Sequence, residues 1–280
     1  MQAGAISKYF NRNADYWRDV YLRREVLAET YRRRQSTALS LIDALKLSPA
    51  ATRALEIGCG AGFCTIALAR RGFSVTAVDS ATAMVEVASR RVAAEDMAAR
   101  IQVQLADVRS LPFEDGSFQV VLALGLLAWL DGPQPALREI ARVTSPGGHV
   151  IVSAANRSAL HNLIDPTLNP ALQPLKRWMR RTAMAAGLDV GPRARLHSRR
   201  AIDRALRRAG LTKVRGLTLG FGPFTVFRLP VLPRWAGLRA FGALQRLADG
   251  GVPIVRSAGR TYLVLARKEQ DRIGGQQSNA

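Results

Sequence analysis

The pattern of apolar and polar positions divides the chain into regions of different character. Residues 1–50 place apolar and aromatic side chains among arginines without strand-like alternation, which predicts an N-terminal helical cap. From residue 54, short apolar runs such as ALEI, SVTAV and FQVVLAL alternate with amphipathic segments such as TAMVEVASRRVAA. Strands that alternate with helices are typical of a parallel sheet with helices on its faces, so we predict an α/β fold.

Two proline-rich stretches interrupt this alternation, at 156–197 and 220–259, and each contains four prolines. Between them the sequence predicts a helix at 198–209 and a strand at 213–219. A further helix is expected at 235–247, inside the second stretch. We interpret the two stretches as insertions that build the region where an acceptor molecule binds, because binding residues concentrate in connections carried by a rigid scaffold.

The resulting organisation is a cap or lid at 1–50, a main domain at 51–268 and a polar tail at 269–280. A strand at 261–266 closes the main domain. The tail lacks apolar residues at regular spacing and is expected to be disordered.

The segment 55–62, LEIGCGAG, has the pattern of a strand that ends in a glycine-rich turn and opens a helix. Such turns bind cofactors in α/β sheets, and glycine is needed where the backbone turns tightly and approaches a ligand without a Cβ. The spacing is G-x-G-x-G instead of the G-x-G-x-x-G of dinucleotide binders, and Glu56 stands two residues before Gly58. A carboxylate there would repel a pyrophosphate but suits a ligand with an amino group and a positive sulfonium.

Acids also follow the next two predicted strands. Asp79 ends the second strand, 21 residues after Gly58, where a carboxylate can accept both hydroxyls of a ribose. Asp107 ends the third strand, where an acceptor can meet an adenine amino group. Three acids at three successive strand ends make a specific pattern.

With these motifs the chain resembles the class I S-adenosylmethionine-dependent methyltransferases, closely from about 54 to 153 and more weakly to 268. Two further family-like phrases are LPFEDGSFQVV at 111–121 and LREIARVTSPGGHVIV at 137–152. The resemblance implies a Rossmann-like, doubly wound sheet of seven strands in the order 3-2-1-4-5-7-6, the last one antiparallel, with insertions after strands 5 and 6. It also implies S-adenosyl-L-methionine as the cofactor and similarity to the methyltransferases of quinone and tetrapyrrole biosynthesis.

Carried over residue by residue, the resemblance implies a cofactor site at the strand ends. Its methionine side consists of Glu56, Gly58, Cys59, Gly60, Gly62 and Leu124, the last between Ala123 and Gly125. Its ribose and adenine side consists of Asp79, Ser80, Met84, Asp107 and Val108.

Methyl transfer from a sulfonium is an in-line displacement, in which the protein positions the acceptor and excludes water. This scheme requires neither a metal nor a protein nucleophile. A base helps when the acceptor is a hydroxyl, and His161, just past the fifth strand on the cofactor side, is the candidate. The alternative is a structural histidine, because the sequence does not fix where the ring points. His149 is expected at the opposite end of that strand and His197 in a loop before a helix.

Acceptor-binding residues are expected in the lid and beyond the fourth and fifth strands. Tyr16 and Trp17 resemble an aromatic lid, although ordinary helix packing explains them equally well. Trp129 is a candidate pocket wall where many relatives place a histidine. Asn156 and Arg157 complete the set on the cofactor side of the fifth strand.

The chain is strongly basic, with 41 Lys and Arg against 21 Asp and Glu, a net charge of +20. Residues 157–215 contain fourteen basic and three acidic residues, and 217–232 is largely apolar. Such a surface could contact an anionic membrane and collect an amphiphilic acceptor such as a quinone or glycolipid. The favoured alternative is a solvated face, because only five of the 41 basic residues are Lys and this Arg bias can have other origins. Nucleic acid is disfavoured because no recognition module is present.

Taken together, the sequence predicts a cytoplasmic or membrane-peripheral methyltransferase that acts on a small or lipid-like molecule, with O-methylation preferred over C- or N-methylation. Its longest apolar run, at 120–130, is about half of the ~20 residues that a spanning helix needs. The two cysteines suggest neither a disulfide framework nor a metal site. Alternatives are an RNA- or protein-directed methyltransferase and a non-catalytic cofactor-binding scaffold. A nicotinamide oxidoreductase is disfavoured by Glu56 and the glycine spacing, and the oligomeric state stays open.

Overall fold

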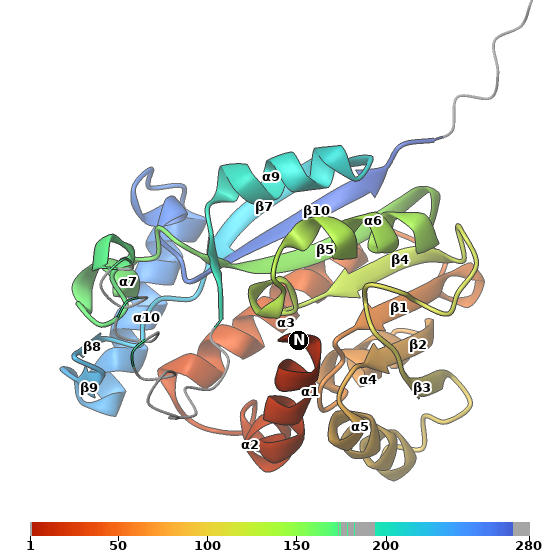
Figure 1. The fold of residues 1–280 in the computed structure, drawn as a ribbon, viewed down its shortest axis with the longest axis horizontal. Coiled ribbons are helices and arrows are strands. Elements are labelled where there is room, and N and C mark those ends of the chain that lie inside the picture. The colour runs from red at the N-terminus through yellow and green to blue at the C-terminus, as the bar shows by residue number, and fades with distance from the viewer. Residues whose placement is uncertain (1, 173, 175–177, 179–181, 183–193, 271–280) are drawn as a thin grey trace, which may run out of the picture.

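The computed structural model describes residues 2–172, 174, 178, 182 and 194–270, and its centre is a twisted mixed sheet (Figure 1). Seven strands lie in the order β3-β2-β1-β4-β5-β10-β7, and the short β6 pairs with the end of β5. The strands are β1 (Arg53–Ile57), β2 (Ser74–Asp79), β3 (Ile101–Leu105), β4 (Phe118–Ala123), β5 (Thr144–Asn156), β6 (Leu196–His197), β7 (Leu211–Leu219) and β10 (Thr261–Lys268). Strands β3 to β5 are parallel, whereas β10 runs antiparallel to both β5 and β7. The predicted α/β class and strand order are confirmed.

Helices cover both faces of this sheet (Figure 1). They are α1 (Gln2–Arg12), α2 (Ala14–Asp19), α3 (Val26–Ala44), α4 (Phe63–Ala69), α5 (Thr82–Ala94), α6 (Pro133–Val143), α7 (Leu160–Ile164), α9 (Arg199–Arg208) and α10 (Arg234–Asp249). A small hairpin of β8 (Thr225–Val226) and β9 (Leu229–Pro230) precedes α10.

The strands are apolar on both sides because each face of the sheet has its own core. On β5, Val150 and Val152 pack in a cluster that also holds Leu137 of α6. Ile151, between them, packs on the other face in a cluster with Ile42 of α3. Successive side chains of a strand point to opposite faces, so a continuous apolar run buries both.

The helical character predicted for 1–50 agrees with α1, α2 and α3, but these helices do different things. Helix α3 packs on β10, β7 and α4 and so forms part of the sheet's own cover, whereas α1 and α2 contact α5. The insertion at 156–197 carries α7 and β6 in its described part, and that at 220–259 carries the hairpin and α10. The division into a cap and a main domain stays a prediction, and the tail lies outside the described residues from 271 onward.

Candidate cofactor and acceptor site

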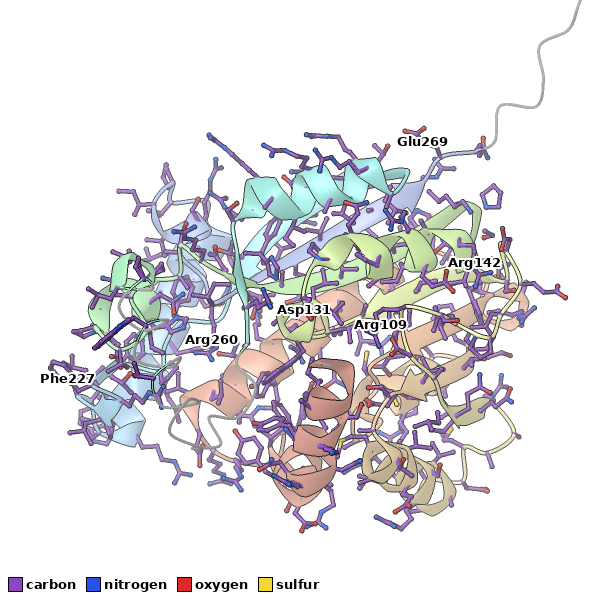
Figure 2. All side chains as sticks on the ribbon, viewed as in Figure 1. Arg109, Asp131, Arg142, Phe227, Arg260 and Glu269 are labelled. Atoms are coloured by element: carbon purple, nitrogen blue, oxygen red, sulfur yellow. The ribbon has the colours of Figure 1, made fainter. Side chains whose placement is uncertain are left out.

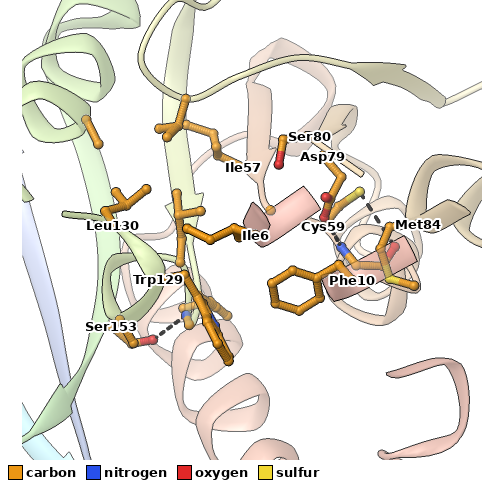
Figure 3. Close-up of a pocket in the computed structure, with 18 of the residues that line it drawn as sticks. Ile6, Phe10, Ile57, Cys59, Asp79, Ser80, Met84, Trp129, Leu130 and Ser153 are labelled. Atoms are coloured by element: carbon orange, nitrogen blue, oxygen red, sulfur yellow. Dashed lines mark hydrogen bonds between the residues drawn. The ribbon is translucent and has the colours of Figure 1, made fainter. Parts of the chain in front are cut away.

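A cavity of about 420 Å³ lies at the carboxyl ends of β1, β2 and β4, between the sheet and the N-terminal helices (Figure 3). Figure 3 shows Asp79 and Met84 on one side of it, Trp129 and Ser153 on the other, and Phe10 of α1 between them. Ligands bind at this end of open α/β sheets because the connections that leave the strands diverge there. Helices α1, α2 and α3 enclose the same space from outside the sheet.

The glycine-rich turn after β1 leads into this cavity. The backbone N–H groups of Gly58 and Cys59 donate to the carbonyl of Val78, which fixes the turn against β2. Gly62 has φ +77° and lies so close to α5 that an added Cβ would meet the Cβ of Ala88 at 3.4 Å. Gly60 has φ +53°, and an added Cβ would meet no atom within 4 Å. The close approach of Gly62 to Ala88 allows α4 and α5 to pack tightly. The empty space at Gly60 leaves its backbone open to a ligand.

Glu56 is a buried carboxylate at the end of β1, only 4% exposed. It accepts a hydrogen bond from the hydroxyl of Thr65 on α4. Burial raises the pKa of Glu56 to about 7, and the bond from Thr65 and the positive charge of Arg34 lower it in part. A cationic amino group would stabilise the ionised form of this carboxylate.

Asp79 follows the last pairing of β2 with β1 and faces the same turn. Its two carboxylate oxygens accept the backbone N–H groups of Gly60 and Ala81, both at 3.0 Å. Burial raises the pKa of Asp79, and these backbone hydrogen bonds lower it in part. The side chain is therefore fixed in direction, and its remaining lone pairs are available to hydroxyl donors.

Asp107 lies just after β3 and is more exposed than the other two acids. Arg109 donates to it from Nε at 2.9 Å, and this hydrogen bond lowers the pKa of Asp107. Val108, between them, is buried and lines the cavity together with Met84 of α5.

A continuous row of aromatic rings from the N-terminal region, the start of α4 and the segment after β4 lines the outer wall. Neighbouring ring centroids lie 4.6–5.9 Å apart, in the order Trp129, Phe10, Trp17, Tyr31, Tyr21 and Phe63. The indole N–H of Trp17 is buried and has no hydrogen-bond partner among the described residues. These ring contacts pack the N-terminal helices against one another and against the sheet domain. They also give the cavity an apolar wall.

Three arginines that the sequence analysis did not select line the cavity: Arg109, which pairs with Asp107, and Arg34 and Arg260. Arg34 of α3 donates to the hydroxyl of Tyr21 at 3.1 Å, and its buried Nε has no partner in the described structure. Its guanidinium lies 2.5 Å from the position that a Cβ on Gly125 would take. In a chain with 41 basic residues, no local signal distinguishes Arg34 and Arg260 from the rest.

Most of the predicted site residues lie together around the cavity. Those that line it are Glu56, Gly58, Cys59, Gly60, Asp79, Ser80, Met84, Asp107, Val108, Leu124, Trp17 and Trp129. Five predicted residues are absent from the described lining: Gly62, Tyr16, Asn156, Arg157 and His161.

The last four of these have other surroundings. Tyr16 packs edge-on against Trp17, with ring centroids 5.3 Å apart. The Asn156 side chain donates to the carbonyls of residues 257 and 259 and thereby ties β5 to the loop before β10. The Arg157 backbone N–H donates to the carbonyl of His197. His161 is buried, 6% exposed, with its Nε2 3.1 Å from Nη1 of Arg260.

Comparison with known proteins agrees with this geometry. Residues 55–152 match the family described as "Methyltransferase domain". The match begins in β1 and ends in β5, so it contains the glycine turn and all three strand-end acids. Fold, site and match support the predicted class I S-adenosylmethionine-dependent methyltransferase domain in this part of the chain.

Individual relatives share the same region of sequence. A ubiquinone biosynthesis O-methyltransferase of Xanthomonas axonopodis pv. citri is 33% identical over 114 residues, 40% of this chain and 47% of that protein. A demethylmenaquinone methyltransferase of Clavibacter sepedonicus is 38% identical over 104 residues, 37% of this chain and 41% of that protein. The chain thus spans about half the length of the curated relatives it matches.

Solved structures extend the likeness of the fold over nearly the whole chain. Magnesium protoporphyrin IX methyltransferase from Synechocystis PCC 6803, solved with bound SAH, aligns with a TM-score of 0.65 at 18% identity. The alignment covers 96% of this chain and 100% of that one. The fold is therefore shared beyond the segment that is recognisable by sequence.

Proposed function

We propose that this protein transfers a methyl group from S-adenosyl-L-methionine to a small or lipid-like acceptor, with an oxygen as the methylated atom. The observation that carries the proposal is a single cavity with Glu56, Asp79 and Asp107 on the sheet side and aromatic rings on the helix side. The relatives named as O-methyltransferases support oxygen as the acceptor atom.

The residues of the cavity fit S-adenosylmethionine, which supplies an electrophilic methyl group on a sulfonium. The Glu56 carboxylate would hold the amino group, and Arg34, whose buried Nε has no protein partner, would hold the carboxylate. Asp79 would accept the ribose hydroxyls, and Met84 and Val108 would contact the adenine. The open space above Gly60 would admit the ligand next to the backbone.

The protein's own contribution to the reaction is position and exclusion of water. The row of rings from Trp129 to Tyr21 closes the outer side of the cavity, so that the acceptor atom is held in line with the transferred methyl group. All three histidines belong to the described chain, and none of them lines the cavity. Cys59 does line it, but burial raises the pKa of its thiol well above the ordinary value, so the thiol stays protonated.

Calorimetric titration with S-adenosylhomocysteine, with NADH as the control ligand, tests the cofactor assignment. We expect micromolar affinity for the first and none for NADH. NADH binding would contradict the assignment and favour an oxidoreductase. A screen with isotopically labelled donor would follow, in which incorporation into RNA or protein, or none at all, would favour the corresponding alternative functions.

We also propose that the face formed by the β8–β9 hairpin and the start of α10 contacts an anionic membrane. Its apolar side chains are well exposed, with Phe227 66%, Leu229 69% and Trp235 63% accessible (Figure 2). Arg228 and Arg234 lie in the same segment, which contains no acidic residue from 225 to 240. Exposed apolar side chains flanked by arginines match the apolar and anionic layers of a lipid surface. Among the described residues, no helix is long and apolar enough to span a bilayer.

Sedimentation with phosphatidylcholine vesicles, with and without phosphatidylglycerol, tests this face. We expect binding only to the anionic vesicles and a loss of at least fivefold in Phe227→Ser/Trp235→Ser. Leu105→Ser is the matched control, because Leu105 is 57% exposed but lies on β3 at the opposite edge of the sheet (Figure 1). Equal sedimentation of all three proteins would contradict membrane contact by this face.

A further inference from the structure

Arg260 is a charged residue inside the cavity that the proposed cofactor contacts do not use. It stands immediately before β10, and its backbone is fixed on both sides. Its N–H donates to the carbonyl of Gly220 at 2.6 Å, and its carbonyl accepts the N–H of Asn156 at 2.9 Å. Figure 2 labels Arg260 away from the edge of the molecule where Phe227 lies.

The protein satisfies only part of the guanidinium. Nη1 donates to Nε2 of His161 at 3.1 Å and approaches the carbonyl of Gly222 at 3.4 Å. A guanidinium has five N–H donors, so three of them, on Nε and Nη2, have no hydrogen-bond acceptor in the described structure. None of these nitrogens is sealed off from solvent, and Arg260 is part of the cavity lining. The remaining donors are therefore accessible from the cavity.

The charge of Arg260 is also uncompensated. No carboxylate forms an ion pair with it in the part of the chain that the structure describes. Burial lowers the pKa of Arg260, which expresses the cost of the charged form at this position. His161 does not compensate this charge, because burial and the nearby Arg260 lower the pKa of His161 to about 3, so that its ring is neutral and acts only as a hydrogen-bond acceptor. A partly buried cation without a paired anion is costly, and an anionic ligand would offset that cost.

Arg34 and Arg260 come from different elements of the cavity lining, and both lie near Tyr31. Arg34 reaches Gly125 and interacts with Glu56, on the β1 and β4 side where the methionine part of the cofactor is assigned. Arg260 precedes Thr261, which pairs with Ala155 near the end of β5. Ala155, Thr261 and Ala194 also line the cavity there, and the phenols of Tyr31 and Tyr16 lie close enough to act on the charge of Arg260.

We propose that Arg260, positioned by His161 and Gly222, forms an anion-binding subsite that takes the carboxylate or phosphate group of an amphiphilic methyl acceptor. The subsite rests on the proposed methyl transfer for its role, but its ligand chemistry follows from Arg260 alone. A planar guanidinium binds carboxylate and phosphate through two parallel N–H bonds, and Nε and Nη2 provide that pair. The aromatic rings at Trp17 and Trp129 would contact the apolar part of the same molecule.

Three probes of one shape test the subsite: 1-naphthoate, 1-naphthyl phosphate and the neutral 1-naphthamide. Each is titrated calorimetrically into the protein with and without S-adenosylhomocysteine. We expect at least one anion to bind ten times more tightly than the amide, and the better anion identifies carboxylate or phosphate as the group recognised. Equal affinity of all three probes would overturn the proposal.

Arg260→Met and Arg260→Lys separate this subsite from the cofactor site. Both variants are expected to lose at least tenfold in anion affinity, Lys because it lacks the two-pronged geometry, and to keep S-adenosylhomocysteine affinity within twofold. Arg34→Met is the matched control: it should lose S-adenosylhomocysteine affinity and keep its anion affinity. A loss of S-adenosylhomocysteine binding in Arg260→Lys would assign Arg260 to the cofactor and overturn the subsite.

Two further readouts keep the outcomes distinct. Arg260→Met is expected to retain or raise the melting temperature, because it removes an unpaired, partly buried charge, whereas a purely structural arginine would lower it. A wild-type protein that prefers the anions without binding S-adenosylhomocysteine would contradict the proposed function and leave the subsite standing. A protein that binds S-adenosylhomocysteine but shows no anion preference would overturn the subsite and leave the proposed function standing.

Discussion

The two walls of the cavity differ in how completely the protein satisfies its own polar groups. On the sheet wall, each of the three acids already has a partner: Glu56 has Thr65, Asp79 has two backbone N–H groups, and Asp107 has Arg109. On the helix and insertion wall, buried nitrogens of Trp17 and Arg34 have no partner among the described residues, and three donors of Arg260 have none.

This difference separates a preorganised surface from one that a ligand completes. Hydrogen bonds to Asp79 fix its carboxylate before any ligand arrives, which reduces the ordering cost of binding. On the opposite wall, the three free donors of Arg260 face the cavity, where an acceptor group of a ligand can replace water as their partner. We therefore expect substitutions on the sheet wall, and at Arg34 beside Glu56, to change cofactor affinity, whereas substitutions at Arg260 should change acceptor affinity.

The largest expected effect concerns the pH dependence that Glu56 gives to the ligand-free protein. Its folded-state pKa of about 7 lies above the ordinary 4.5, so folding favours the protonated form. The stabilisation is complete below pH 4.5 and is lost as the pH rises through 7, a change of about 3 kcal/mol at most. Glu56→Gln should abolish this part of the pH dependence in urea unfolding between pH 4.5 and 8.

Ligand binding sharpens the same test. A cationic amino group favours ionised Glu56, so S-adenosylhomocysteine should stabilise the wild type more at pH 8 than at pH 6. The difference should be absent in Glu56→Gln. Identical pH profiles of the two proteins would show that Glu56 neither titrates in this range nor faces the amino group.

Gly60→Val is expected to weaken S-adenosylhomocysteine binding about a hundredfold, or about 2.7 kcal/mol. A branched side chain is strained at the φ of +53°, and it would project into the open space where the ligand is assigned. Calorimetry measures the effect. Gly242→Ala in α10, where an added Cβ meets nothing within 4 Å, is the control for a neutral glycine substitution. Unchanged affinity in a folded Gly60→Val protein would remove the turn from the cofactor site.

Asp79→Ala should cost at least tenfold in S-adenosylhomocysteine affinity, about 1.4 kcal/mol, through the lost ribose hydrogen bonds. Affinity for 1-naphthoate in the absence of cofactor should stay within twofold, because Asp79 is on the sheet wall. Glu86→Ala, at an exposed acid of α5, controls for the change in net charge. A parallel loss of both ligands would show that the two walls act as one site.

The sequence predicted the sheet wall better than its opposite, for a topological reason. Glu56, Asp79 and Asp107 each stand at or just after the carboxyl end of a parallel strand, and parallel strands place their carboxyl ends at one edge of a sheet. Position along the chain therefore implies position in space. Strand order and the antiparallel final strand came with the resemblance to a known family, and the structure confirms both.

The opposite wall depends on contacts between distant segments, which no local pattern encodes. Arg260 meets His161 across 99 residues, and Arg34 approaches Gly125 from a helix that precedes the sheet. His161 was predicted to be on the cofactor side of β5, but its ring direction depends on α7 and on the loop before β10. Asn156 was predicted to bind the acceptor for the same reason, but its side-chain amide instead donates to two backbone carbonyls of the loop before β10.

The smallest expected effect, that of His161→Gln, decides between two roles for this residue. A glutamine oxygen can still accept the N–H of Arg260, so a positioning residue predicts at most a threefold loss of 1-naphthoate affinity and unchanged S-adenosylhomocysteine affinity. His161→Phe, which provides no acceptor, should lose more. A general base predicts instead that both variants bind normally and lose turnover together with an acceptor found in the screen. Because the pKa of His161 is about 3, its neutral form would be complete above pH 5, and a rate that rises between pH 6 and 7.5 must come from another group.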